Sequence, residues 1–185
     1  MRRVLALLSS VVFGLGQTAW ADPTADDIRA FHALVQTGGA AAVERALMTD
    51  PALATATDRF GFQAIHLLDD ADFEEILSLL LRHGADINAQ NESGIALLHI
   101  VIDPEFIPIV LDLGADLELK DVQGRTPLLV ALTEPDNFEV VRALLQGGAD
   151  PNARDTKGRT ALNYARADGG DRAIATLLLN AGALD

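Results

Sequence analysis

The side chains best suited to chemistry in this chain are two histidines and a nearby group of acids. His66 and His99 each lie five residues after a glycine, and an acid-rich segment at residues 69–75 follows the first histidine. A histidine beside carboxylates can act as a general base, and two histidines can contribute ligands to a metal ion. One hypothesis is therefore a hydrolase that uses His66 with the acids of residues 69–75.

The segments that would position these side chains repeat along the chain. Gly-Ala-Asp begins at residues 84, 114 and 148, and Gly-Ala returns at residue 182, so successive copies are 30, 34 and 34 residues apart. A second phrase that starts with a glycine keeps the same register at residues 61–66, 94–99, 124–129 and 158–163. Self-similarity at this period is typical of stacked supersecondary units that present a long binding surface.

The paired phrases resemble the ankyrin repeat, in which a helix starts with Thr-Pro-Leu-His after a glycine and the unit ends with Gly-Ala-Asp-x-Asn. Residues 124–128 read Gly-Arg-Thr-Pro-Leu, and residues 84–88 and 148–152 match the closing phrase. The resemblance covers residues 58–185. It implies an all-α solenoid of stacked helix-turn-helix units with short β-hairpin-like fingers, and it implies that the shared histidine hydrogen-bonds backbone groups of neighbouring turns.

The repeats favour a structural role for His66 and His99. Leu129 and Asn163 fill the same position in the later copies, and two histidines alone make a poor metal site. The acid-rich segment lacks the glycine and the closing glutamate of the known calcium-loop pattern. The sequence contains no glycine-rich phosphate loop, His-Glu-x-x-His motif or Gly-x-Ser-x-Gly elbow. We therefore expect no catalysis, no cofactor and no metal site.

Six segments follow from the pattern. Residues 1–21 read as a signal peptide, because two arginines precede a short apolar run that ends in Ala19-Trp20-Ala21. Residues 22–57 read as an N-terminal capping repeat. Residues 58–90, 91–120, 121–154 and 155–185 are repeats 1 to 4. Export would place the protein in the periplasm or outside the cell.

The capping repeat is expected to contain two helices, at residues 28–35 and 40–48, with Asp26 or Asp27 capping the first. Thr126 and Thr160 are expected to cap the inner helices of repeats 3 and 4. Pro104 and Pro108 should delay or bend the outer helix of repeat 2, and its helix-to-helix turn should be short.

The charge of the chain limits the class of partner. The 185 residues include no cysteine and carry a net charge of −13; without the two arginines of the signal peptide, 12 basic and 27 acidic side chains leave −15. Such a surface disfavours nucleic acid and anionic membranes and attracts a basic protein surface. The alternative is that the acids only keep the stack soluble. We expect a monomer that binds another protein and does not insert into a membrane after cleavage.

Partners of ankyrin-like stacks usually bind the finger tips and the concave face of the inner helices. The resemblance therefore assigns partner binding to the variable finger positions and to two acids of the first inner helix: Arg59, Phe60, Phe62, Glu92, Ser93, Ile95, Val122, Gln123, Arg125, Thr156, Lys157, Arg159, Asp69 and Asp70. Phe60 and Phe62 either anchor a partner or pack against the capping repeat.

The leading interpretation is a periplasmic protein-binding module without catalysis. One alternative is an immunity protein or inhibitor of an envelope-acting toxin enzyme. Another is an accessory factor for a periplasmic stress-defence enzyme.

Overall fold

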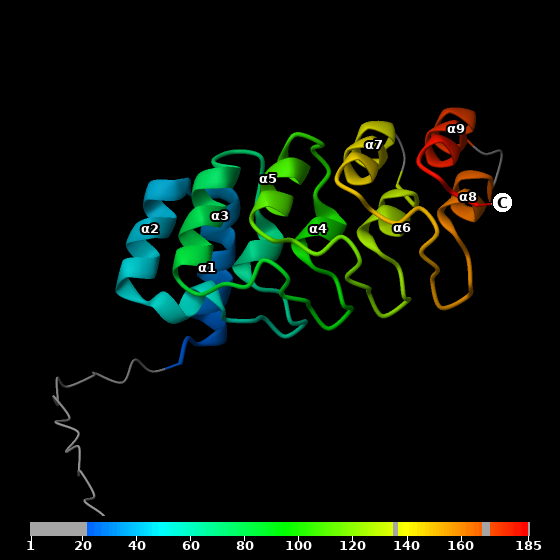
Figure 1. The fold of residues 1–185 in the computed structure, drawn as a ribbon. Helices are drawn as coiled ribbons and strands as arrows, with labels where there is room; N and C mark the ends of the chain where they lie inside the picture. The colour runs from blue at the N-terminus through cyan, green and yellow to red at the C-terminus, as the bar shows by residue number, and fades with distance from the viewer. Residues whose placement is uncertain (1–21, 135–136, 168–170, 185) are drawn as a thin grey trace, which may run out of the picture.

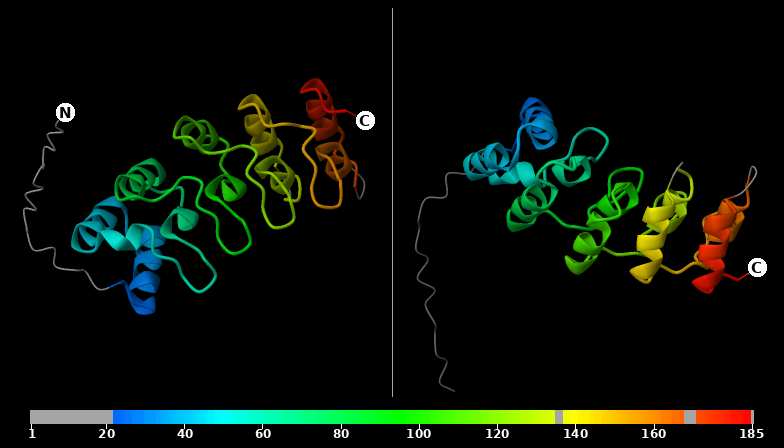
Figure 2. Two further views of the ribbon diagram at one scale, coloured as in Figure 1. Left: turned by 60° about the horizontal axis from the view of Figure 1, so that its bottom comes forward. Right: turned by 90° about the horizontal axis from the view of Figure 1, so that it is seen from above.

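The computed structural model describes residues 22–134, 137–167 and 171–184, so the predicted signal peptide lies outside the described residues. The described chain consists of α-helices, short 3-10 helices and turns, with no strand among its residues, which confirms the all-α prediction. Helix pairs follow one another in chain order, and hairpin-shaped loops project from the same side of the stack (Figures 1 and 2).

The N-terminal unit contains the two expected helices. They are α1 (Ala25–Thr37) and α2 (Ala40–Thr49), and the 3-10 helix η1 (Pro51–Ala54) follows them. The prediction that Asp26 or Asp27 caps α1 is wrong. Thr24 is the cap: its hydroxyl accepts a hydrogen bond from the Asp27 amide (3.3 Å), and the Asp27 carboxylate accepts one from the Thr24 amide (3.0 Å). Asp27 thus completes a capping box from inside the helix.

Each later unit pairs a short inner helix with a longer outer helix. The pairs are η2 (Ala64–Leu67) with α3 (Phe73–Arg82), α4 (Leu97–Ile100) with α5 (Phe106–Asp112), α6 (Pro127–Ala131) with α7 (Phe138–Gln146), and α8 (Ala161–Ala165) with α9 (Arg172–Asn180).

The outer helices end in the same way in all four repeats. The amide of the alanine in each Gly-Ala step donates to the carbonyl five residues back, as from Ala85 to Leu80 (3.0 Å) and from Ala183 to Leu178 (2.9 Å). The glycine that precedes each of these alanines has a left-handed backbone, with φ between 93° at Gly84 and 100° at Gly148. This is a Schellman ending, which glycine adopts without strain. Leu80 and Leu178 are both fully buried in the continuous core of the stack.

Repeat 2 has a shorter outer helix than repeat 1, but the late start that the prolines predicted is wrong. Helix α5 has 7 residues against 10 in α3, and both helices begin 12 residues after the glycine of their finger. Pro108 is the third residue of α5. Amides in the first turn of a helix have no carbonyl partner within the helix, so the missing amide hydrogen of proline costs no hydrogen bond there.

The short turn is not unique to repeat 2. The outer helix begins 12 residues after the finger glycine in both early repeats (Gly61 to Phe73, Gly94 to Phe106), but 14 residues after it in repeats 3 and 4 (Gly124 to Phe138, Gly158 to Arg172).

Thr126 and Thr160 occupy the N-cap positions of α6 and α8 as predicted, but neither hydroxyl accepts a capping hydrogen bond from the helix backbone. Instead, a side chain three residues into the unit accepts a hydrogen bond from the backbone amide at the cap position. His66 Nδ1 accepts from the Gln63 amide (3.0 Å), and Asn163 Oδ1 accepts from the Thr160 amide (2.9 Å). The Thr160 hydroxyl is 3.2 Å from the same oxygen, which is the geometry of a donor to Asn163. In repeat 3 the equivalent residue is Leu129, and the buried Thr126 hydroxyl has no partner among the described residues.

Candidate protein-interaction surface

Each finger is built around one side chain at its base. The fingers are residues 58–62, 91–95, 121–125 and 155–159. In the third, Asp121 Oδ1 accepts hydrogen bonds from the amides of Gln123 (2.9 Å) and Arg125 (2.8 Å), and the Asp121 amide donates to the Arg125 carbonyl (3.0 Å). Asp58, Asn91 and Asp155 make the same pattern in the other fingers.

These base residues were not among the sequence predictions. An Asp or Asn three residues before every finger glycine was the available signal. Such side chains favour tight turns because they bind nearby backbone amides.

Successive fingers are joined through their backbones. The Glu92 amide donates to the Phe60 carbonyl (3.1 Å), the Val122 amide to Ser93 (3.0 Å) and the Thr156 amide to Gln123 (2.9 Å). The fingers pack closely because each tip has a glycine: a Cβ on Gly94 would lie 2.8 Å from the Asp121 Cα. The row of fingers is therefore held by main-chain groups, which leaves the tip side chains available.

Most of the predicted finger residues are exposed at these tips. The exposed ones are Arg59, Phe60, Glu92, Ser93, Val122, Gln123, Thr156, Lys157 and Arg159. Phe60 has 51% of its surface exposed, and the Arg59 guanidinium lies over its ring at 4.6 Å from the centroid. An exposed aromatic ring beside an arginine is the kind of pair that commonly anchors a protein partner.

Phe62 is positioned differently from Phe60. It is half-buried, and its ring meets the His66 ring edge-on at 5.7 Å between centroids. Ile95 is half-buried at the matching place in the second finger. Phe62 therefore has a packing role within its own repeat.

The two finger arginines in repeats 3 and 4 make intramolecular ion pairs. Arg125 lies 2.7 Å from the buried carboxylate of Asp121, and Arg159 Nε lies 2.8 Å from that of Asp155. Arg159 also lies over the Tyr164 ring (4.4 Å), and the Tyr164 hydroxyl donates to Asp155 (2.8 Å). Burial raises the pKa of Asp155, but hydrogen bonds from the Arg159 amide, Tyr164 and the Arg159 guanidinium outweigh it and hold the pKa well below its usual range.

The shared histidines hydrogen-bond the backbone of the next finger, as the resemblance implied. His66 Nε2 lies 3.0 Å from the carbonyl oxygens of both Ala89 and Ile95, and His99 Nε2 lies 3.3 Å from that of Arg125. Burial lowers the pKa of His99, which favours its neutral form.

Both histidines use their ring nitrogens for contacts with the backbone. Both ring nitrogens of His66 contact backbone atoms, whereas Asp69 and Asp70 are exposed in the turn after η2. Within the described residues, no group of three or more His, Asp or Glu side chains is arranged to hold a metal ion.

Comparison with known proteins decides the family. A sequence profile of ankyrin repeats in three copies matches residues 65–155 and 98–184. The chain belongs to the ankyrin-repeat family. Ankyrin repeats are protein–protein interaction modules, and the family is generally non-enzymatic.

Ankyrin-repeat relatives resemble part of this chain. It is 38% identical to ankyrin repeat and SOCS box protein 6 of Mus musculus over 96 residues, which is 46% of this chain and 23% of that protein. It is 32% identical to the B-cell lymphoma 3 protein homolog of Mus musculus over 109 residues (55% and 24%), and 38% identical to an ankyrin repeat protein of Rickettsia felis over 64 residues (30% and 28%). The chain thus spans about a quarter of each of these three relatives.

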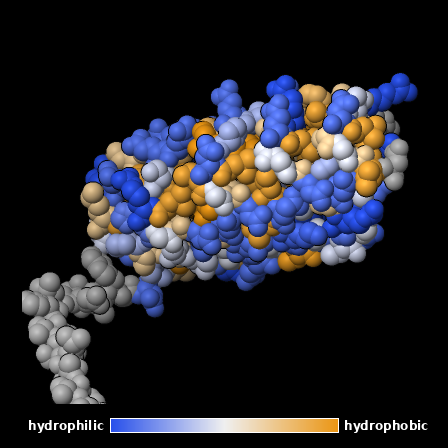
Figure 3. All heavy atoms as spheres, viewed as in Figure 1, coloured by the Kyte–Doolittle hydropathy of each residue, from blue (hydrophilic) through white to orange (hydrophobic). Residues whose placement is uncertain are grey.

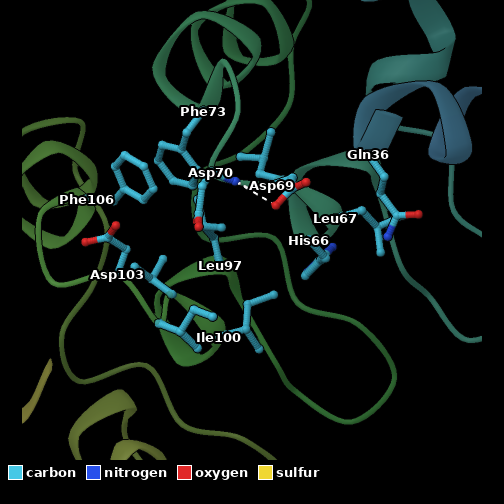
Figure 4. A pocket seen from close by; sticks show the side chains of 13 residues that line it. Gln36, His66, Leu67, Asp69, Asp70, Phe73, Leu97, Ile100, Asp103 and Phe106 are labelled. Carbon is cyan, nitrogen blue, oxygen red and sulfur yellow. Dashed lines mark hydrogen bonds between the residues drawn. The ribbon is translucent and has the colours of Figure 1, made fainter. Parts of the chain in front are cut away.

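Two pockets lie beside the connection of repeat 2 in this ankyrin stack. The first, of about 440 Å³, lies between the inner segments of repeats 1 and 2, and the second, of about 470 Å³, lies between repeats 2 and 3. Ile100, Val101 and Ile102 line both. Figure 4 shows the first pocket with Asp69, Asp70 and Asp103 around it.

The described part of the stack contains no helix with the length and apolar character that crossing a bilayer requires.

Proposed function

We propose that this ankyrin-repeat chain is an exported module that binds another protein through its finger tips and has no catalysis of its own. The observation that carries the proposal is the construction of the fingers. Backbone amides and carbonyls join each finger to the next, so the exposed tip side chains are not needed to hold the stack. Side chains that the fold does not use are free to determine specificity.

The first finger is the proposed anchor. Arg59 and Phe60 are both exposed and already stacked, so little side-chain freedom is lost when a partner covers them. Arg125 and Arg159 are weaker candidates, because each is paired with an acid of its own finger.

The net charge of −13 supports a basic partner surface and argues against nucleic acid. It also favours the alternative of an inhibitor or immunity protein, because an acidic stack can cover a basic active cleft of a toxin enzyme. An accessory factor for a periplasmic stress-defence enzyme would use the same surface without blocking catalysis.

The test is affinity capture from an envelope extract of the source cell, followed by identification of the bound proteins. The wild-type chain is compared with a double variant, Arg59→Ala with Phe60→Ala. Phe62 is left unchanged because it packs on His66. The matched control is Leu179→Ala on the outer helix α9, since Leu179 is 45% exposed and Phe60 is 51% exposed.

We expect the wild type and the control to capture the same partner and the double variant to lose it. Retention of every specific partner by the double variant would place the interface elsewhere. Enzyme assays on the captured partner then separate the alternatives, since an inhibitor abolishes the partner's activity and an accessory factor preserves or raises it.

Export has its own measurement. The intact mass of the protein from a periplasmic fraction should correspond to a chain that begins at Asp22. An intact mass that includes residues 1–21 would contradict cleavage at the proposed site.

A further inference from the structure

The connection between the helices of repeat 2 exposes apolar side chains that the core does not use. Ile102 is 77% exposed, and Ile100 precedes it at the end of α4. Large apolar side chains exposed side by side often mark a contact surface. Figure 1 shows the connections of repeats 1 and 2 on the side of the stack opposite the fingers, so this surface is separate from the finger tips.

We propose that the first pocket and the adjoining ridge of Ile100 and Ile102 form a docking groove for a partner segment that carries apolar side chains flanked by lysine or arginine. The inference rests on the proposed function, because it assumes a protein partner. It adds a second contact region and the chemistry of the segment that occupies it.

The groove exists because the first two repeats are short at this edge. Their outer helices begin two residues earlier than those of repeats 3 and 4, so the connecting turns cover less of the inner segments. The buried Leu97 lines the pocket beside the exposed Ile100, and Phe73 and Phe106 line it from the outer helices, with their ring centroids 4.1 Å apart (Figure 4). In Figure 3, apolar surface runs across the part of the visible face that α3 and α5 occupy.

The rim of the groove is acidic. Asp69, Asp70 and Asp103 line the first pocket, and Glu134 lines the second pocket on the far side of the ridge. Among the described residues, neither pocket is lined by a lysine or an arginine. A groove with apolar side chains and a negatively charged rim is complementary to an apolar segment with flanking positive charges.

The same charges disfavour the other occupants. A second copy of this chain would bring the same acids to the groove if the two copies met face to face. An anionic membrane or a nucleic acid would be repelled by a chain of net charge −13. A basic, apolar protein segment remains the occupant that both features of the groove favour.

The probe is a fluorescein-labelled 12-residue peptide with two leucines four positions apart and lysines on both sides. Two matched peptides replace either the lysines with glutamate or the leucines with serine. Fluorescence anisotropy gives the dissociation constants at two salt concentrations. We expect the basic, apolar peptide to bind at least about tenfold more tightly than either matched peptide.

The protein variants change only exposed positions, so the fold should be retained. Ile102→Ser should weaken binding by about tenfold. Its control is Leu184→Ser, which removes a similarly exposed aliphatic side chain (71%) at the C-terminal end of the stack and should leave binding unchanged.

The double variant Asp69→Asn with Asp70→Asn should weaken binding and reduce its salt dependence, because it removes charge from the rim. Asp22→Asn with Asp112→Asn changes the charge equally, at exposed positions that line neither pocket, and should have a smaller effect.

The proposal is overturned if the glutamate peptide binds as well as the lysine peptide, if Ile102→Ser binds like the wild type, or if both charge variants weaken binding equally. It is also overturned if Ile102→Ser abolishes a dimer seen by light scattering, since the occupant would then be a second copy. These results are independent of finger binding: the capture experiment with Arg59→Ala and Phe60→Ala can succeed while the peptide experiment fails.

Discussion

The residue three positions after the N-cap of each inner helix determines whether the backbone amide of the N-cap residue has a hydrogen-bond partner. His66, His99 and Asn163 accept a hydrogen bond from the backbone amide at the cap position, whereas Leu129 has no atom that can accept one. The two histidines also reach a carbonyl of the next finger, that of Ile95 for His66 and that of Arg125 for His99, so they couple neighbouring repeats. A position that invited a catalytic interpretation is thus a structural link between units.

Replacement of Thr126 with valine should not destabilise the protein. The Thr126 hydroxyl is buried without a partner, so its removal ends a desolvation cost and should raise the free energy of unfolding by up to about 1 kcal/mol. Thr160→Val is the control, since it removes a hydroxyl that bonds to Asn163 and should lower the free energy of unfolding. Urea unfolding measures both. A larger loss in Thr126→Val than in Thr160→Val would show that the Thr126 hydroxyl has a partner.

His99 should make the fold less stable in mild acid. Burial lowers its pKa below the ordinary value of 6.5, while the Arg125 carbonyl and Asp121 partly oppose the shift. As the pH falls below 6.5 the unfolded chain takes up a proton before the native one, so the free energy of unfolding falls. The fall ends once native His99 is itself protonated.

The variant His99→Leu tests this effect, because repeat 3 has leucine at the same place. Its overall stability should be lower, since two hydrogen bonds are lost. Its loss of stability between pH 7 and 5 should nevertheless be smaller than that of the wild type. Some loss should remain, because burial also lowers the pKa of His32. Identical pH profiles for the two proteins would contradict the role given to His99.

At the scale of elements, the outer helices were predictable and the details of the inner ones were not. Leucine runs that end in Gly-Ala are local signals, and they placed α3, α7 and α9. The start of an inner helix depends on which side chain three residues later can reach back, and threonine alone did not reveal this. The ion pair between Asp121 and Arg125 was readable in principle from their four-residue spacing.

Two classes of glycine should respond differently to alanine. Gly94 and Gly114 both have positive φ, at 74° and 94°. A Cβ on Gly114 meets open space, so Gly114→Ala should cost about 1–2 kcal/mol from backbone strain alone.

A Cβ on Gly94 would also collide with the backbone of Asp121 and Val122, so Gly94→Ala should lower the free energy of unfolding further. Urea unfolding again gives the comparison. If Gly94→Ala and Gly114→Ala lowered the free energy of unfolding equally, neighbouring fingers would be able to separate enough to accept the extra Cβ without loss of stability.

For the whole molecule, the repeat pattern of the sequence predicted a stack of helix pairs, but it did not predict which apolar side chains are exposed on the surface of the stack. The exposed ridge of Ile100 and Ile102 depends on how the short connections of repeats 1 and 2 lie against the inner helices, which spacing alone does not give. The same holds for Phe60 and Phe62: both flank Gly61 in the sequence, but only Phe60 is exposed.

The N-terminal unit should contribute to the stability of the whole stack, because units in a solenoid stabilise their neighbours. Leu47 on α2 is fully buried in the continuous core, and Leu47→Ala should cost about 2–5 kcal/mol. The adjacent Met48 is 69% exposed, and Met48→Ala should have little effect. Thermal or urea unfolding that shows similar stability for both variants would mean that the unit does not cap the stack.

The central claim is that the finger tips, first of all Arg59 and Phe60, bind a protein partner. The most direct test is isothermal titration calorimetry of the captured and purified partner against the wild type, the Arg59→Ala with Phe60→Ala variant, and Leu179→Ala. The claim predicts that the finger variant binds at least about tenfold more weakly, while Leu179→Ala binds like the wild type. Equal affinities for all three proteins would contradict it.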